Sequence, residues 1–164
     1  MSSDALRNSL LAARDRRQEL LDTLFPTPFS ATVMLSLNLP GAEKTGARAD
    51  RLFAWGERAL LAAMNGSAAA RGHDALGPFA LYRTRLLATQ VKRLGIALEG
   101  AHPAGRLLDL DVYDHAGNQM GRADLDVAPR SCLICREPAL ACIRAGRHSS
   151  DELARAARAL IDAL

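Results

Sequence analysis

Two stretches of the chain alternate between apolar and polar side chains, which is the pattern of a strand with one buried face. Residues 30–39 alternate in this way and end at Pro40-Gly41. Residues 108–112 alternate leucine and valine with aspartate. A further short strand is predicted at 79–82. A turn at 114–118 is predicted to lead into a return strand near 119–126, which makes a hairpin with the aspartate-bearing strand.

Longer segments repeat apolar residues at helical spacing. They predict helices over 4–24, 47–65 and 84–99, although Gly95 weakens the third assignment. The tail from about residue 136 is predicted to be mostly helical, with Ser150-Asp151-Glu152 opening the last helix. Residues 72–78 are predicted to be a loop.

The order of these elements predicts the fold class. Strands and helices mix without the regular alternation that a doubly wound parallel sheet requires. We therefore expect one α+β domain over residues 1–164, with a small, mostly antiparallel sheet and helices packed on it. The 164 residues are enough for a single domain with its own core.

Composition narrows the class of function. The formal charge of +3 is compatible with a phosphate-bearing ligand but does not argue for nucleic acid, and aromatic residues make up only 4%. Charged residues interrupt the N-terminal segment, so it is not a signal peptide, and no run reaches the roughly 20 apolar residues of a membrane span. We expect a cytoplasmic protein that does not bind a membrane, with reduced cysteines.

Asp109 and Asp111 are candidate ligands for a divalent cation. On a strand they share one face, and two residues of rise bring both carboxylates within reach of one ion. Mg²⁺ prefers such hard oxygen ligands and leaves its other positions to water and substrate phosphates. The alternative interpretation is an exposed strand face that is acidic without a metal role.

The three cysteines form a second candidate site together with one histidine. Cys132, Cys135, Cys142 and His148 have the spacing C-x2-C-x6-C-x5-H. Four such ligands suit tetrahedral Zn²⁺, and a site closed by four protein ligands is structural. The alternative is that the cysteines are reduced, unligated thiols packed in a helical tail.

A basic segment lies in the first predicted helix, where Arg14 and Arg17 flank Asp15 and Arg16. Its simplest interpretation is a solvated helix face.

These motifs together resemble a known family. The segment His102-Pro103-x-Gly105-Arg106-Leu107-x-Asp109-x-Asp111-Val112, followed by Arg130-x-Cys132-Leu133-x-Cys135, Cys142 and His148, is similar to holo-citrate lyase synthase, CitX, the apo-citrate lyase phosphoribosyl-dephospho-CoA transferase. Arg14-Asp15-x-Arg17-Gln18, Pro40-Gly41-x-x-Lys44, Phe53 and Gly56 agree with the same family. The resemblance is specific over 102–148 and loose over 65–100.

The resemblance implies a reaction and two partners. The substrate would be 2′-(5″-triphosphoribosyl)-3′-dephospho-CoA, and its phosphoribosyl-dephospho-CoA part would pass to a serine of the citrate lyase acyl carrier protein while pyrophosphate leaves. This is a nucleotidyltransferase-type step, in which charge at the phosphates must be neutralised.

That chemistry suggests roles for the motif residues. Asp109 and Asp111 are expected to hold Mg²⁺, and Arg106 to neutralise the triphosphate. Arg14, Arg17 and Lys44 are suggested as further phosphate ligands. Asp15 is suggested to orient an arginine or to deprotonate the serine. Arg122 and Asp124 are suggested as residues that lie behind the metal ligands. His102, before a proline in a turn, is interpreted as structural rather than as a proton carrier.

Two other functions are compatible with the sequence. The first is the same chemistry on another carrier, such as that of malonate decarboxylase. The second is a zinc-containing binding module without catalysis, in which the two aspartates are surface acids. Substitution of both aspartates distinguishes the second from an enzyme.

Overall fold

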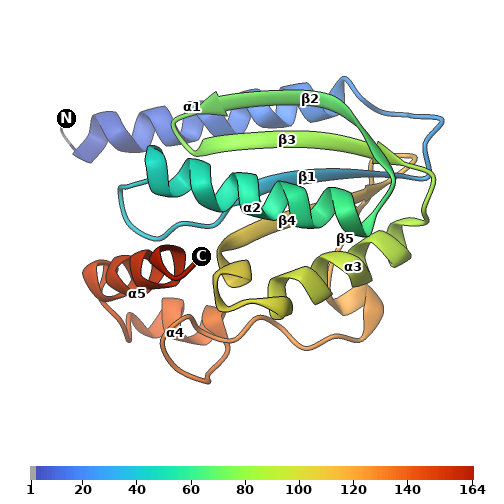
Figure 1. The fold of residues 1–164 in the computed structure, drawn as a ribbon. Helices are drawn as coiled ribbons and strands as arrows, with labels where there is room; N and C mark the ends of the chain where they lie inside the picture. The colour runs from blue at the N-terminus through green and yellow to red at the C-terminus, as the bar shows by residue number, and fades with distance from the viewer. Residues whose placement is uncertain (1–2) are drawn as a thin grey trace.

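One antiparallel sheet of five strands, with the order β2-β3-β1-β4-β5, organises the computed structural model, which describes residues 3–164 (Figure 1). The strands are β1 (Ala31–Leu37), β2 (Gly66–Asp74), β3 (Gly77–Thr84), β4 (Leu108–Asp114) and β5 (Gln119–Met120). The α-helices are α1 (Ser3–Asp22), α2 (Ala47–Ala63), α3 (Ala88–Ala101), α4 (Ala139–Ala145) and α5 (Ser150–Asp162), with 3-10 turns η1 (Pro103–Leu107) and η2 (Ala123–Leu125). The α+β prediction is confirmed.

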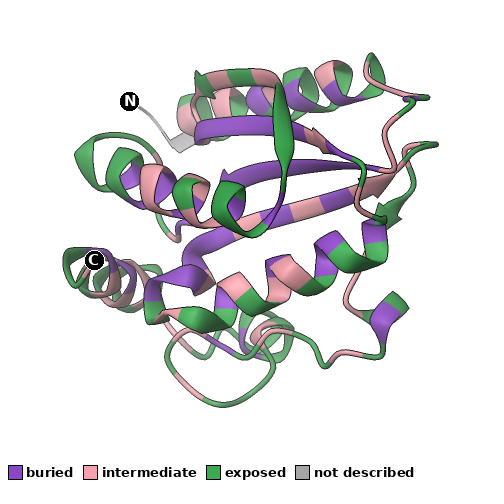
Figure 2. Cartoon of the chain, turned by 45° about the vertical axis from the view of Figure 1, so that its right-hand side comes forward, coloured by how far each residue is buried: buried purple, intermediate pink, exposed green. Residues whose placement is uncertain are grey.

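Alternation along β1 and β4 gives the sheet two different faces. Val33 and Leu35 of β1 and the apolar residues of β4 lie in the main core, which α2 and α3 cover. Leu108, Leu110 and Val112 are each no more than 1% exposed. Figure 2 shows the central strands as the buried layer between the helices, with β2 exposed at the edge.

Helix α1 covers part of the opposite face. Leu21 of α1 packs on Met34 of β1 and Leu81 of β3 in a second, smaller cluster. Asp109 and Asp111 belong to this same face, because they pair across the sheet with Ser36 and Met34. The period of two therefore predicted correctly that both carboxylates share one face.

An ion pair fastens α1 to the hairpin of β2 and β3. Arg17 donates from Nε and Nη2 to the carboxylate of Asp74 at 2.8 and 2.7 Å, and also to the carbonyl of Gly77 at 2.8 Å. Its guanidinium lies 4.3 Å from the centre of the Phe79 ring. Burial alone would raise the pKa of Asp74, but hydrogen bonds from Arg17 and from the Leu76 amide outweigh it and lower that pKa.

We expect Asp74→Asn to destabilise the protein, because Arg17 would remain buried without its counter-charge. Breaking one side of such a pair costs about 3 kcal/mol, and thermal unfolding at pH 7 would measure it. Since the pKa of Asp74 is lowered, this stability is present above the ordinary aspartate pKa and is lost as pH falls through the folded-state value. Glu19→Gln on the exposed side of α1 is the control. Equal melting temperatures for both variants would contradict the assignment.

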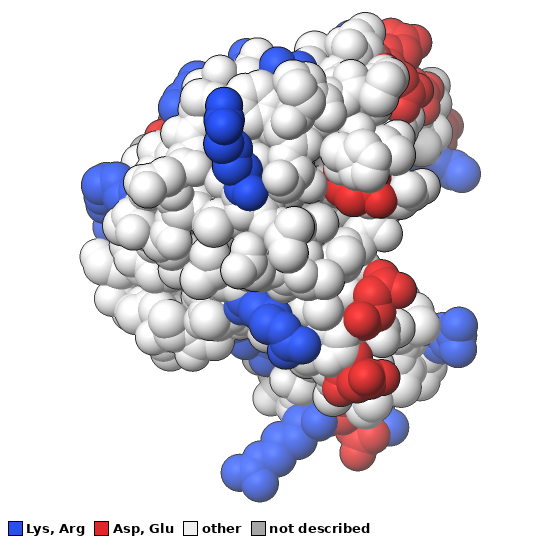
Figure 3. Space-filling model, turned by 90° about the vertical axis from the view of Figure 1, so that its right-hand side faces the viewer, with Lys and Arg blue, Asp and Glu red and all other residues white. Residues whose placement is uncertain are grey.

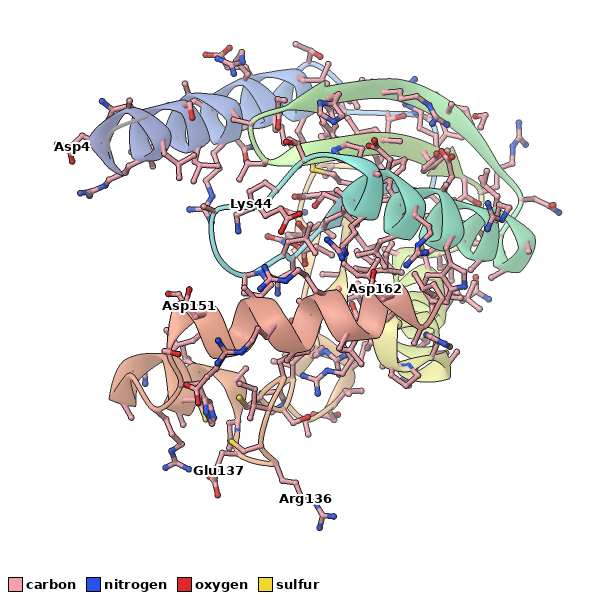
Figure 4. The ribbon with its side chains drawn as sticks, turned by 60° about the vertical axis from the view of Figure 1, so that its left-hand side comes forward. Asp4, Lys44, Arg136, Glu137, Asp151 and Asp162 are labelled. Atoms are coloured by element: carbon pink, nitrogen blue, oxygen red, sulfur yellow. The ribbon has the colours of Figure 1, made fainter. Side chains whose placement is uncertain are left out.

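The C-terminal segment packs beneath α2. Ala157 and Ile161 of α5 enter the main core, and Arg48 of α2 donates to Asp162 at 2.9 Å. Figure 4 shows α5 crossing below α2 with Asp162 turned toward it. Arg136 and Glu137, on the loop that precedes α4, point away from the body of the protein.

Two sequence predictions are wrong. Residues 72–78 were predicted as a loop, but Gly72–Asp74 end β2 and Gly77 begins β3, so only 75–76 form the turn. The sequence Gly66–Asp74 is small and polar, and the strand forms because it pairs with β3 along the sheet edge. The strand predicted over 119–126 ends at Met120, and η2 follows it.

Candidate functional site

A polar cavity of about 300 Å³ lies between α1 and the uncovered part of the sheet. Its floor carries Asp109 and Asp111 of β4 and Ser36 of β1. Its lining also includes the predicted residues Arg14, Arg17 and Lys44. Five of the six residues predicted to bind metal or substrate at this site therefore line one cavity, although they come from three separate parts of the chain.

The two aspartates differ in environment. Asp111 accepts a hydrogen bond from Nε2 of Gln119 at 2.8 Å, and its burial and then the negative charge of Asp109 raise its pKa. The Asp109 side chain is 39% exposed and lies 3.6 Å from Nη2 of Arg130. Two adjacent carboxylates that repel each other are a favourable ligand pair for a divalent cation.

Positive charge also lines this cavity. Lys44 lies on the loop that joins β1 to α2, and Figure 4 shows it between α1 above and α5 below. Its Nζ donates to the Leu39 carbonyl. Partial burial and then the charge of Arg14 lower the pKa of Lys44. An anion bound between the two cations would reverse the electrostatic part of that shift.

A glycine allows the Lys44 loop to reach this position. Gly77 has a φ of +97°, and a Cβ there would lie 2.4 Å from the Lys44 carbonyl oxygen. Any other residue at the start of β3 would push this loop away from the cavity. The same glycine carbonyl accepts from Arg17, so the hairpin, α1 and the loop are held together at one point.

Arg130 is a site residue to which the sequence analysis gave no role. The carboxylate of Glu99, 6% exposed, accepts from Arg122 at 2.5 Å and from Nε and Nη2 of Arg130. This buried anchor fixes the Arg130 guanidinium beside Asp109. The signal available in the sequence was only its place in the family motif, because Glu99 lies 31 residues earlier, on α3.

A second cavity, of about 320 Å³, adjoins the first. Its aliphatic walls come from η1, α4, α5 and the loop that carries Cys132. Polar groups also line it, namely Arg106, Arg130, and Cys132, Cys142 and His148 of the candidate metal cluster. Asn38 lines both cavities, and Arg130 lines this one while contacting Asp109 in the other. The two cavities are therefore parts of one continuous surface.

Arg106 lines the second cavity and not the polar one. Its guanidinium donates to the Ser131 hydroxyl at 3.2 Å, to the Cys132 carbonyl at 3.1 Å and to the Ser131 carbonyl. The structure thus separates Arg106 from the carboxylates it was grouped with, because η1 turns its side chain toward the cysteine loop before β4 begins.

The four predicted thiol and imidazole ligands meet at one place. The Sγ atoms of Cys132, Cys135 and Cys142 and a ring nitrogen of His148 all lie within 4.8 Å of one another. Cys135 Sγ is 3.4 Å from Cys142 Sγ and 3.3 Å from His148 Nε2. A zinc ion with Zn–S bonds of about 2.3 Å places tetrahedral ligands about 3.7 Å apart. The cluster therefore has the size and donor set of a metal site.

Backbone amides favour the thiolate form of Cys132, whereas burial and hydrogen bonds to the neighbouring thiols raise the pKa of Cys142. The Ile134 amide lies 3.5 Å from Cys132 Sγ. Burial would raise the pKa of Cys132, but the amides of Cys135 and Ile134 and the neighbouring thiols lower it to about 6. A thiolate is the form that ligates zinc.

The remaining candidates have local structural contacts. His102 Nδ1 accepts from the Ala104 amide at 3.1 Å, which caps η1, and its ring lies 5.5 Å from that of Trp55. Asp124 accepts from the Gly121 amide at 2.6 Å, and Arg122 pairs with Glu99. Asp15 is exposed on α1.

Charge on the surface is unevenly distributed. Figure 3 shows acidic side chains concentrated along one edge of the displayed face, above and below an indentation, with Lys and Arg more scattered. None of the helices over residues 3–164 is long and apolar enough to cross a membrane.

Comparison with known proteins identifies the family. The CitX family, described as apo-citrate lyase phosphoribosyl-dephospho-CoA transferase, matches residues 6–164. A protein of Escherichia coli O139:H28 that carries this same name is 33% identical over 158 residues, which cover 93% of this chain and 86% of the relative. Protein CitXG of Leuconostoc mesenteroides subsp. cremoris is 34% identical over 148 residues, 85% of this chain, and CitXG of Haemophilus influenzae is 32% identical over 155 residues, 88% of this chain.

This chain spans 30% and 32% of the length of those two CitXG proteins, so it corresponds to one part of each. The matches cover nearly all of the chain, including the two aspartates, the four metal-site residues and Arg130. The chain belongs to the CitX family, the apo-citrate lyase phosphoribosyl-dephospho-CoA transferases.

Proposed function

We propose that this protein transfers phosphoribosyl-dephospho-CoA from 2′-(5″-triphosphoribosyl)-3′-dephospho-CoA to a serine of the citrate lyase acyl carrier protein. The serine hydroxyl oxygen bonds to the α-phosphorus and its proton is released, the bond from that phosphorus to the bridging oxygen breaks, and pyrophosphate leaves with that oxygen. The observation that carries the proposal is the polar cavity, which Asp109, Asp111, Arg14 and Lys44 line together in a member of this family. Phosphoryl transfer depends mainly on such positioning and charge neutralisation.

The residues on the cavity floor fit a magnesium ion. Asp109 and Asp111 supply hard oxygen ligands, and the cavity leaves room for substrate oxygens. Burial and then the charge of Asp109 raise the pKa of Asp111, and a bound cation would offset that charge. Magnesium bound there would neutralise charge on the transferred phosphate and on the departing pyrophosphate. Gln119 orients the Asp111 carboxylate through its hydrogen bond.

Three basic residues hold the phosphates in this proposal. Arg14 and Lys44 bind the terminal phosphates, since they line the same cavity as the carboxylates and lie near each other. Arg130 binds nearer the α-phosphate, because Glu99 holds it beside Asp109. Arg17 lines the cavity, but its Nε and Nη2 donate to Asp74 and Gly77, so we assign it to holding α1 in place.

The thiol cluster fits a structural zinc ion in the same proposal. Four protein ligands leave no open coordination position for substrate or water. Zinc bound there would join the loop after η2 to α4 and to the start of α5. It would also fix the Ser131 and Cys132 carbonyls to which Arg106 donates.

The function is tested by mass spectrometry of purified carriers. The protein is incubated with the triphosphoribosylated substrate, Mg²⁺ and either apo-citrate lyase carrier or apo-malonate decarboxylase carrier. We expect the citrate lyase carrier alone to gain one phosphoribosyl-dephospho-CoA, with one pyrophosphate released per modified carrier. Modification of the malonate decarboxylase carrier alone would assign the chemistry to that carrier, and modification of neither would exclude the proposal.

We expect Arg130→Gln to lower the transfer rate ten- to a hundredfold. One charge-assisted contact to a phosphate contributes on the order of 1.5–3 kcal/mol, and glutamine cannot supply the charge. Arg122→Gln is the matched control, because Arg122 also pairs with Glu99 but is not among the residues lining either cavity. Single-turnover rates of the two variants, corrected for folded fraction, make the comparison. Equal losses would show that only the Glu99 cluster matters, and not a phosphate contact.

A further inference from the structure

We propose that the aliphatic cavity beside the polar cavity binds the adenosine part of the substrate. This inference rests on the proposed function, because it places a second portion of the same molecule. It also assigns a role to a surface for which the transfer chemistry itself has no use.

The first argument is the connection between the two cavities. In the substrate, the triphosphate is joined through one ribose to the 2′-oxygen of a second ribose, which carries adenine. With the α-phosphate at Asp109 and Asp111, the base must lie about two sugar rings away. The aliphatic cavity is next to the polar one, since Asn38 lines both cavities and Arg130 contacts Asp109 while lining the aliphatic one.

The second argument is the chemistry of the walls. Leu107, Leu133, Ala139, Ile143 and Leu153 give an apolar lining, and the volume of about 320 Å³ lies in the range of small-molecule sites. Adenosine is uncharged and carries a flat aromatic ring that such walls desolvate favourably. Arg106 and Arg130 line the same cavity and could contact the 5′-diphosphate that follows the nucleoside in dephospho-CoA.

The third argument is that polar groups stand where a nucleoside needs them. The Asn38 side chain has both donor and acceptor atoms. Arg106 is held in place by Ser131 and Cys132, and a guanidinium fixed in this way presents a flat face for stacking on a base. This role explains why Arg106 lies apart from the carboxylates, because Arg106 would contact the nucleoside and not the triphosphate.

The test uses the substitution Ala139→Leu, which adds a larger side chain to one wall of the cavity. Ala139 lines it at the start of α4, whereas Ala141 on the same helix is exposed and does not. Calorimetry measures binding of 3′-dephospho-CoA, with adenosine and pantetheine 4′-phosphate as competitors. We expect Ala139→Leu to weaken binding at least tenfold and to raise KM equally with kcat nearly unchanged. Ala141→Leu should match the wild type, and adenosine should compete.

The outcomes separate this inference from the proposed function. Normal transfer with unchanged dephospho-CoA binding and KM in Ala139→Leu, at an unchanged melting temperature, would overturn the inference alone. Competition by pantetheine phosphate and not by adenosine would also overturn it, because the cavity would then hold the opposite end of the molecule. Wild-type protein that binds dephospho-CoA in an Ala139-dependent way but modifies no carrier would exclude the transfer and support the cavity assignment.

Discussion

Asp109→Asn and Asp111→Asn are each expected to lower the transfer rate about a thousandfold or more, while the protein remains folded. Charge stabilisation by a bound metal contributes several kcal/mol to the transition state, and about 4 kcal/mol corresponds to a thousandfold. Asparagine keeps the shape of the side chain but removes the charge that binds the ion. Rates of carrier modification at saturating Mg²⁺ measure the effect. Asp126→Asn is the control, since Asp126 is exposed and asparagine tolerates its φ of 55°.

Stability distinguishes a metal-binding carboxylate from a structural one. Because burial and Asp109 raise the pKa of Asp111, its ionised form at pH 7 opposes folding in metal-free protein. This penalty grows as pH rises from the ordinary aspartate pKa to the raised folded-state value. Asp111→Asn should therefore raise the melting temperature without metal, and Mg²⁺ should stabilise only the wild type. Desalting should be used to remove Mg²⁺, since chelators also strip zinc. The metal role would be excluded if Asp109→Asn and Asp111→Asn lowered the melting temperature, did not change the response to Mg²⁺ and left the transfer rate normal.

Loss of the thiol cluster is expected to have the largest effect on stability. Purified protein should contain about one equivalent of zinc, and Cys135→Ser should lower the melting temperature by about 10 °C. The unfolded chain has no preformed cage, so zinc binding contributes several kcal/mol to folding, and about 4 kcal/mol shifts a protein of this size by roughly that amount. The value of kcat per folded molecule should change only severalfold, because the closed site takes no part in the chemistry.

The histidine ligand offers a matched comparison. His148→Asn should also lower the zinc content and the melting temperature, whereas His115→Asn, at the exposed turn between β4 and β5, should alter neither. Metal-free protein of normal stability would show that the cysteines are packed thiols. A Cys135→Ser protein that is stable but inactive would move the cluster into the active site.

Short-range patterns predicted the parts of the site whose residues lie close together in the sequence. The alternation in β4 fixes the common face of Asp109 and Asp111, and the cysteine spacing predicts four ligands that do meet. Contacts between distant elements have no such pattern. Arg17 pairs with Asp74 57 residues later, and Glu99 reaches Arg130 across 31 residues. The sequence alone does not distinguish a basic helix residue that faces solvent from one that binds a phosphate or pairs with a buried carboxylate.

Strand β2 was missed for a related reason. Its sequence of small and polar residues carries no alternation, since most of its side chains are exposed. Its conformation is imposed by hydrogen bonding to β3 along the sheet edge. The position of Arg106 likewise depends on η1, whose turn directs the side chain away from the strand that follows it.

The arrangement of like charges in the polar cavity has a thermodynamic consequence. Asp109 and Asp111 repel each other on the floor, and Arg14 and Lys44 repel each other on the wall. A divalent ion relieves only the first repulsion and a free triphosphate only the second, so each leaves a charge imbalance that the other corrects. Magnesium and the triphosphate should therefore bind with positive linkage, each raising the affinity of the other by the same factor. In the proposed transfer, the same reciprocity would favour departure of the ion and pyrophosphate together.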